Sequence, residues 1–162
     1  MNSMILAMGL CYGGLAQIIA GIMEFTRGNL FGMIAFLSYG FFWWSLVFTI
    51  VIPTLGYAKA PDNNAMSCYL FIWGVFSLIM LVGSYLKRLP LMLSWVFFTV
   101  VLLFSLLAAY HWTLSPGVLK TAGIEGVICG LSAIYLAAAE ILNELAGRQV
   151  LYVGLRTQPS RK

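Results

Sequence analysis

Two acidic side chains, Glu125 and Glu140, lie within one long apolar segment at residues 118–142. An acid surrounded by hydrocarbon must be paired, protonated or in contact with water, so such acids are candidate functional sites. We therefore interpret Glu125, Glu140 and the nearby Asn143 as candidate proton or polar sites. Because each acid lies close to an end of its segment, the alternative that it simply reaches water stays open.

A glutamine accompanies a stripe of glycines in the first apolar segment. Gly9, Gly13, Gln17 and Gly21 recur every four residues, which places them on one face of an α-helix. Glycines at this spacing allow a neighbouring helix to approach closely. The Gln17 amide needs a partner there, and it either bonds between helices or lines a path.

Two aromatic stripes follow the helical period in later segments. They consist of Phe36, Tyr39 and Trp43, and of Tyr69, Trp73 and Phe76. Tyr39 adds a hydroxyl beside Gly40, a combination suited to a narrow apolar constriction with one hydrogen-bonding group. Trp73 lies deeper than an interfacial aromatic belt requires. Such stripes also pack helices together, so packing is the competing interpretation.

None of the nine lysines and arginines lies in the middle of an apolar segment. A site that clamps a carboxylate tightly would use a bidentate arginine or helix N-termini. Any anion site should therefore be weak and built from hydroxyls, amides and backbone N–H groups. That construction suits a channel or a low-affinity carrier, with the acid passing together with its proton.

The sequence lacks the motifs of several other function classes. It has no GxxxxGK[ST] phosphate loop, no GxGxxG after a strand and no HExxH zinc motif. The three cysteines lack CxxC spacing, and no Ser/His, paired Asp or His-rich cluster lies within the apolar segments. The basic residues lie at segment ends rather than in a stripe. We therefore expect no enzyme activity, metal, cofactor or nucleic-acid partner.

The segments that must position these residues are long and apolar. Of the 162 residues, 62% are hydrophobic and 9% are charged, and the mean hydropathy is +0.95. Since the hydrocarbon layer is about 30 Å thick, a spanning helix needs about 20 apolar residues. The sequence therefore predicts an all-α integral membrane protein with five transmembrane helices, at residues 4–25, 30–55, 66–86, 91–110 and 118–142.

The basic residues predict the orientation of these helices, because cytoplasmic loops carry an excess of Lys and Arg. Short loops make neighbouring helices antiparallel, and seven basic residues fall on one side against Lys59 and Lys120 on the other. The seven are Arg27, Lys87, Arg88, Arg148, Arg156, Arg161 and Lys162. We expect a transmembrane domain at residues 1–147 and a cytoplasmic tail at residues 148–162. Five spans would leave the N-terminus outside, which suggests that one further N-terminal helix is missing.

Four segments together carry a resemblance to a known family. They read ILAMGLCYGGLAQIIAGIMEFTRGNLFG at residues 5–32, AFLSYGFFW at 35–43, WGVF at 73–76 and CGLSAIYLAAAEILNE at 129–144. The set resembles the acetate uptake transporter family, which includes bacterial succinate-acetate permeases and fungal acetate and ammonium export proteins. The similarity extends from about residue 5 to residue 148.

The resemblance implies a six-helix protomer in a homo-hexamer, with one path through each protomer in the inner (plasma) membrane. It implies uptake of acetate and sometimes succinate, coupled to protons or channel-like. The family's NPAPLGL segment, which opens its first helix, is not present, and this sequence begins where the family's second helix begins. We therefore expect the family's first helix to be missing.

The resemblance also implies roles for particular residues. The tyrosine of the SYG segment that helps form the narrow gate corresponds to Tyr39, and Val100 of WVFFTV matches another apolar gate position. Gln17 and Ala133 fall at positions associated with the path. Two further functions stay open from the sequence: a channel for ammonium, urea or another small solute, and a membrane subunit that does not transport.

The charge asymmetry generates a topology prediction. A single cysteine inserted after Ser160 should react with a membrane-impermeant reagent only from the cytoplasmic side. Labelling can be compared between intact cells and inverted vesicles. Labelling in intact cells would overturn the orientation.

Overall fold

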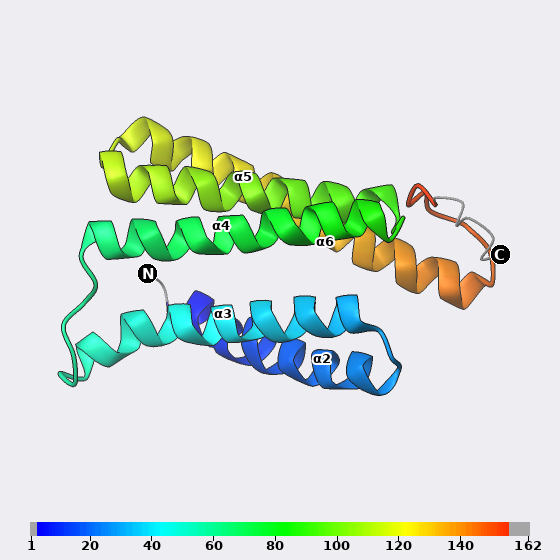
Figure 1. Ribbon diagram of the computed structural model, residues 1–162, viewed down its shortest axis with the longest axis horizontal. Helices are drawn as coiled ribbons and strands as arrows, with labels where there is room; N and C mark the ends of the chain where they lie inside the picture. The colour runs from blue at the N-terminus through cyan, green and yellow to red at the C-terminus, as the bar shows by residue number, and fades with distance from the viewer. Residues whose placement is uncertain (1–2, 156–162) are drawn as a thin grey trace. The chain divides into compact units, whose positions relative to one another are not determined.

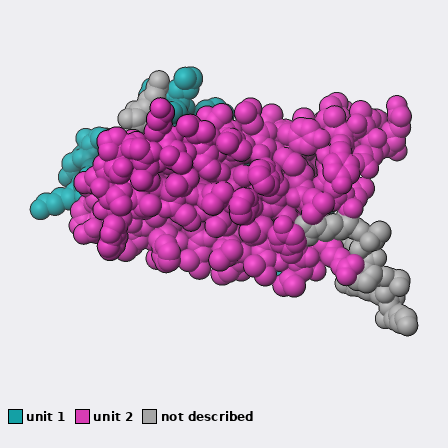
Figure 2. Space-filling view, turned by 90° about the horizontal axis from the view of Figure 1, so that it is seen from above, with its two compact units in different colours: residues 1–61 teal, residues 62–162 magenta. Residues whose placement is uncertain are grey.

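The computed structural model describes residues 3–155, in which all regular secondary structure is helical and the helices are joined by turns and short connections. It divides into two compact units, residues 1–61 and 62–162, drawn in teal and magenta in Figure 2. Each unit is an antiparallel group of helices in which consecutive helices lie side by side (Figure 1).

The first unit is a helical hairpin. Its first arm is one continuous helix made of α1 (Ser3–Met8), η1 (Gly9–Ala16) and α2 (Gln17–Thr26), and its second arm is α3 (Leu30–Thr54). The segment η1 is a π-helix, in which backbone hydrogen bonds run from i to i+5. Asn29 caps α3 because its Oδ1 accepts from the Gly32 N–H at 3.3 Å, and its Nδ2 donates to Glu24 Oε2.

The second unit contains α4 (Asn63–Leu86), α5 (Leu91–Thr113) and α6 (Pro116–Ala146). Helix α5 packs against both α4 and α6. The connections between α4 and α5 and between α5 and α6 are only a few residues long. Leu114 closes α5 at φ +54° and Gly147 closes α6 at φ +61°, both in the left-handed region.

The five predicted helices are confirmed, but several of their ends differ from the prediction. Helix α4 begins three residues earlier than predicted, since Asp62 Oδ1 accepts from the Ala65 N–H at 2.7 Å. The predicted loop at residues 111–117 was too long, because α5 continues through Thr113 and Pro116 starts α6 at a position that suits proline. Helix α6 also continues past residue 142 to Ala146.

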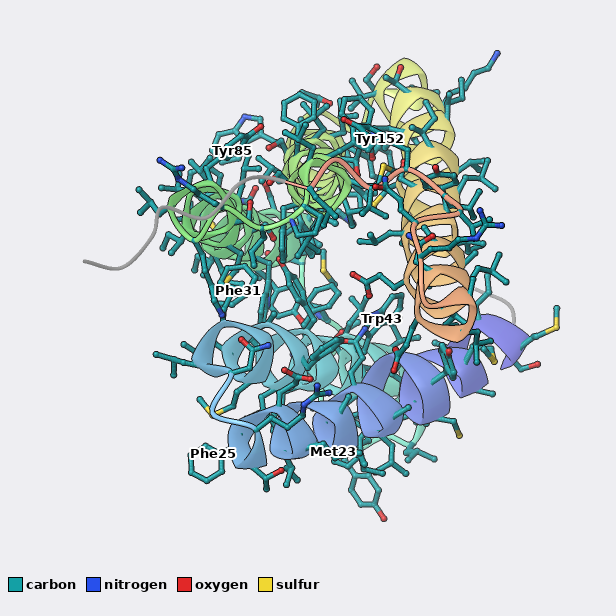
Figure 3. The ribbon with its side chains drawn as sticks, turned by 90° about the vertical axis from the view of Figure 1, so that its right-hand side faces the viewer. Met23, Phe25, Phe31, Trp43, Tyr85 and Tyr152 are labelled. Atoms are coloured by element: carbon teal, nitrogen blue, oxygen red, sulfur yellow. The ribbon has the colours of Figure 1, made fainter. Side chains whose placement is uncertain are left out.

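All five helices are long and apolar enough to span a membrane, counting α1, η1 and α2 as one. In their most apolar 18-residue windows, at most 33% of residues are buried within the protein. The remaining apolar side chains need an apolar surrounding, and in Figure 3 Met23 and Phe25 point away from α3. A hydrocarbon bilayer provides that surrounding.

Hydroxyl groups on these helices bond mainly to the backbone of the preceding turn. Thr49, Ser77, Ser84 and Thr99 each donate to a carbonyl three or four residues earlier. This arrangement gives the hydroxyl a hydrogen-bond acceptor within its own helix, so no neighbouring helix is needed. Ser84 adds a bond between helices, because its Oγ lies 2.8 Å from Ser94 Oγ and both side chains are buried.

The chain folds back after α6 as a short extended segment, residues 150–154, which we call the strap. Asn143 holds it: Oδ1 accepts from the backbone N–H groups of Val150 at 2.6 Å and Leu151 at 2.8 Å, and Nδ2 donates to the Leu151 carbonyl at 2.8 Å. The Tyr135 hydroxyl donates to the Tyr152 carbonyl at 2.9 Å. Residues 156–162, the rest of the predicted tail, lie outside the described residues.

The strap also completes the N-terminus of α5. The N–H groups of Leu91 and Met92, which have no partner within their own helix, donate to the carbonyls of Gly154 at 2.9 Å and Val153 at 3.1 Å. Val153 is buried with Leu136 and Ala139 of α6. The strap therefore joins α5 to α6 through both hydrogen bonds and apolar contact.

Replacing Asn143 with alanine should destabilise the protein by about 1–3 kcal/mol, because three strap hydrogen bonds are lost and backbone groups are left without partners. The apparent melting temperature in detergent measures this loss. Asn64→Ala is the matched control, since Asn64 is exposed in the first turn of α4. Equal melting temperatures for the two variants would mean that the strap adds no stability.

Candidate functional site

The glycine stripe of the first unit receives the tryptophans of α3. A Cβ on Gly13 would lie 2.8 Å from Trp43 Cγ, and a Cβ on Gly9 would lie 3.2 Å from the same indole (Figure 3). A Cβ on Gly14 would collide with the indole of Trp44. Side chains larger than hydrogen are therefore excluded where the two arms of the hairpin meet.

The π-helical segment explains why Gly14 faces α3 in addition to the glycines of the predicted stripe. The sequence predicted a regular α-helix, and the i to i+5 bonding of η1 corrects that expectation. The wider turn places the adjacent Gly13 and Gly14 against Trp43 and Trp44 together. Trp44 Nε1 donates to the Leu10 carbonyl at 3.0 Å, inside the π segment. Trp44 thus fills the space beside η1 and bonds its backbone.

Gln17 is the first residue after η1. Its Oε1 is buried and has no hydrogen-bond partner among the described residues. An unpaired buried carbonyl oxygen costs on the order of 1–3 kcal/mol, so this atom is suited to accept a hydrogen bond from a bound molecule. Such a molecule would have to be a donor, such as water or the O–H of a protonated acid.

Tyr39 lies next to the closest approach of the two arms. A Cβ on Gly40 would lie 2.7 Å from Ile18 Cγ1 and 3.0 Å from the Gly14 carbonyl oxygen. The backbone at Gly40 is therefore fixed against the first arm, and this contact fixes the position of the half-buried Tyr39. Gln17 and Tyr39 belong to the same unit and to the two helices that meet at this contact.

The remaining predicted path residues lie in the second unit. Trp73 packs edge-on between Tyr69 and Phe76, with ring centroids 6.4 and 5.5 Å apart, so the predicted stripe does form one aromatic row on α4. Val100 is half-buried on α5, and Ala133 is exposed on α6. The residue before Ala133 faces α5 instead, since Ser132 Oγ accepts from Trp95 Nε1 at 3.0 Å.

The two acids of α6 differ in their surroundings. Both carboxylate oxygens of Glu125 are buried and have no hydrogen-bond partner among residues 3–155. Glu125 precedes by one turn the buried Cys129, which lies beside Thr99 of α5. Glu140 is exposed, and Asn143 bonds the strap. The structure therefore brings Glu125 near Cys129 and does not group it with Glu140 or Asn143.

Two features of this arrangement were not predicted from the sequence. One is the hydrogen bond from Trp44 to the Leu10 carbonyl, and the other is the π segment. The adjacent glycines Gly13 and Gly14 were the available signal, because a single α-helical stripe needs only one of them. Within the described chain, no group of three or more His, Cys, Asp and Glu side chains could hold a metal ion.

The fold and these sites define the class of protein: an all-α integral membrane protein, in which residues 3–155 form five helices long and apolar enough to span a membrane and a few polar groups lie among apolar side chains. The sequence matches the GPR1/FUN34/yaaH family over residues 1–154. The chain belongs to this family, and the resemblance drawn from its sequence segments is confirmed.

Several relatives support this membership. The succinate-acetate/proton symporter SatP of Escherichia coli K12 is 47% identical over 154 residues, which cover 95% of this chain and 81% of the relative. Ammonia transport outward protein 2 of Saccharomyces cerevisiae is 36% identical over 148 residues, covering 88% of this chain and 50% of that protein. The solved structure of the bacterial acetate channel SatP is 46% identical, with a TM-score of 0.92 and coverage of 95% of this chain and 84% of that one.

The contact between Gly14 and Trp44 generates a stability prediction. Gly14→Ala should cost about 1–3 kcal/mol, because the added methyl group must displace the indole or the backbone of η1. Gly123→Ala is the matched control, since a Cβ on that helical glycine meets nothing within 4 Å. Thermal unfolding in detergent compares the two variants, and a Gly14→Ala protein as stable as Gly123→Ala would contradict the packing described.

Proposed function

We propose that this chain provides a membrane path for small monocarboxylates, chiefly acetate, with succinate as a further substrate. The observation that carries the proposal is the near-complete match to the bacterial acetate channel SatP, at 46% identity and a TM-score of 0.92. The 47% identity to a succinate-acetate/proton symporter supports the same substrate class. The path works either as a channel or with a co-transported proton.

The polar groups of the first unit support a path for a protonated or weakly bound acid. Gln17 Oε1 offers a buried acceptor, which a carboxylate cannot satisfy but a carboxylic acid O–H can. No Lys or Arg lies in the middle of a span, so a bare carboxylate would be left without a compensating charge. Glu125, buried without a hydrogen-bond partner in the described chain, is our candidate for a second proton-accepting group.

We further propose that Tyr39 and Val100 form the apolar gate, and that Gln17, Ala133 and Trp73 line the path. The protein would act as a homo-oligomer, a hexamer by the family resemblance, in the inner (plasma) membrane with a cytoplasmic C-terminus. The excess of basic residues at one end of the helices supports this orientation.

A channel for ammonium or another small solute is the second candidate. The 36% identity to a yeast protein named for outward ammonia transport favours it. The two candidates make different demands on the path, because ammonia is a small neutral base and acetic acid a larger hydrogen-bond donor.

Uptake into liposomes that contain the purified chain tests the function and separates the candidates. Labelled acetate should enter with half-saturation far above micromolar, and its uptake should increase as the external medium is acidified toward the pKa of acetic acid, because the neutral acid avoids burial of an unpaired charge. Labelled urea and methylammonium serve as competing solutes. Flux of those solutes without acetate flux would favour the second candidate, and tight acetate binding without pH dependence would contradict a weak site.

Substitution of Tyr39 tests the gate. Tyr39→Ala should widen the constriction and increase the uptake of larger acids relative to acetate, whereas Tyr39→Phe should keep the size selectivity and lose only the hydroxyl. The ratio of lactate or succinate uptake to acetate uptake measures the change. Unchanged ratios in both variants would mean that Tyr39 packs the helices and that the gate lies elsewhere.

A further inference from the structure

Glu125 differs from the other acids of this chain in its surroundings. The sequence contains five Asp and Glu residues. Asp62 and Glu24 each accept a hydrogen bond near the end of a helix. Glu140 and Glu144 are exposed. Glu125 alone combines buried carboxylate oxygens with the lack of any hydrogen-bond partner in the described chain.

Glu125 lies on the face of α6 that packs against α5 (Figure 1). The buried residues of α6 recur every three or four positions along this face, and they are Ala122, Cys129, Ser132, Leu136 and Ala139. Next to Glu125, a Cβ on Gly126 would lie 3.4 Å from Leu103 Cδ1 of α5. The carboxyl group is therefore held between the two helices, in a contact that we call the α5–α6 seam.

The α5–α6 seam offers no positive charge to an ionised Glu125. Helix α5 contains no Asp, Glu, Lys or Arg, and its single histidine, His111, lies with Nδ1 3.3 Å from Asn63 Oδ1 of α4. The nearest cation along α6 is Lys120, which is exposed and precedes Glu125 by more than one turn. The titratable group beside Glu125 is the thiol of Cys129, whose ionisation would add a second negative charge.

These surroundings fit a proton rather than a metal ion. Ca²⁺ and Mg²⁺ bind several oxygen ligands at once, and the described chain holds no group of three or more His, Cys, Asp and Glu side chains. The nearby hydroxyl of Thr99 donates to the Val96 carbonyl of its own helix. A proton, by contrast, needs only one carboxylate oxygen, and the neutral acid avoids the cost of a buried charge.

The two ends of the α5–α6 seam differ in how they are closed. The end toward the strap is filled by a buried apolar cluster of Leu136, Ala139 and Val153. Toward the other end, Thr121 lies one turn before Glu125 and is exposed. Glu125 itself is about 14 Å along the helix axis from the start of α6, at about 1.5 Å per residue. Water therefore has a shorter and less apolar route to Glu125 from the start of α6 than from the strap.

We propose that Glu125 is a proton-binding site whose carboxyl group is neutral in the resting protein and exchanges its proton with water at the end of α6 that begins at Pro116. The site is a property of the α5–α6 seam. It holds its proton whichever solute crosses the membrane, so a failure of acetate uptake would leave it unaffected.

A hydrophobic carbodiimide tests the site on the complete chain in liposomes. Dicyclohexylcarbodiimide adds to neutral carboxyl groups in apolar surroundings. The O–H proton moves to one nitrogen, the carboxyl oxygen bonds the central carbon, and the acyl group then shifts to the other nitrogen, so the whole reagent is retained. At neutral pH, mass spectrometry should find on the order of tenfold more adduct on Glu125 than on Glu140. Glu125→Gln should abolish this adduct, and Glu140→Gln should leave it unchanged.

Infrared spectroscopy tests the protonation state without relying on access of a reagent. The C=O stretching band of a neutral carboxyl group should be present at neutral pH in the unmodified chain and in Glu140→Gln but absent from Glu125→Gln, with thermal stability checked to exclude misfolding. A chain that shows neither this band nor the adduct would overturn the proposal. So would an adduct that forms only in acidified medium, which would mean an ionised acid, or one that Na⁺ suppresses at constant pH, which would mean an alkali-cation site.

Membrane vesicles of opposite orientation test the direction of proton access. A cysteine inserted after Ser160, labelled with an impermeant reagent, shows which end of the helices faces the medium. An alkaline external medium, with the interior kept neutral, should reduce the carbodiimide adduct on Glu125 only where the Pro116 end of α6 faces outward. A reduction only in the opposite vesicles, or an equal reduction in both, would overturn the proposed direction.

Discussion

Hydrocarbon offers no hydrogen-bond partner, and this constraint decides most of the polar geometry in the chain. Hydroxyls such as those of Thr49 and Thr99 return to the preceding turn of their own helix, where no neighbour is needed. Trp44 and Trp95 each use their single N–H, one on a backbone carbonyl and the other on Ser132. A buried polar atom without a hydrogen-bond partner is costly in such surroundings. The side-chain oxygens of Gln17 and Glu125, which have no partner in the described chain, are therefore candidates for a functional role.

The packing of the first unit depends on glycines at the positions where its two arms come closest. Gly13 and Gly14 accept two large indoles, and Gly40 brings the backbones of the two arms close enough for a carbonyl oxygen to limit further approach. In a membrane the hydrophobic effect does not drive helices together. Close packing at small residues stabilises the helix contact instead. The same contacts hold Gln17 and Tyr39 on neighbouring helices, so a substitution at these glycines should displace both side chains.

The number and approximate position of the helices could be predicted from the sequence because apolar length is a direct requirement of the bilayer. The aromatic row around Trp73 was predicted for a similar reason, since a strict period on one helix needs no knowledge of its neighbours. The π segment could not be predicted, because the helical period alone does not show that the adjacent Gly13 and Gly14 both face α3. The role of Asn143 was also hidden, since its partners are backbone groups of a strap that has no sequence signature.

The division of the chain at residues 61 and 62 has a consequence for its biosynthesis. All the contacts between α3 and the first arm are made by residues that leave the ribosome before α4 begins, and the connecting residues 55–62 contain no helix. The helical hairpin of residues 3–54 can therefore enter the bilayer already packed, with the tryptophans of α3 against the glycines of the first arm. The second group of helices, by contrast, lacks its last hydrogen bonds until residue 154 has been made, because the start of α5 is completed by the strap. Synthesis of the strap thus closes a unit whose first helix, α4, was completed at Leu86.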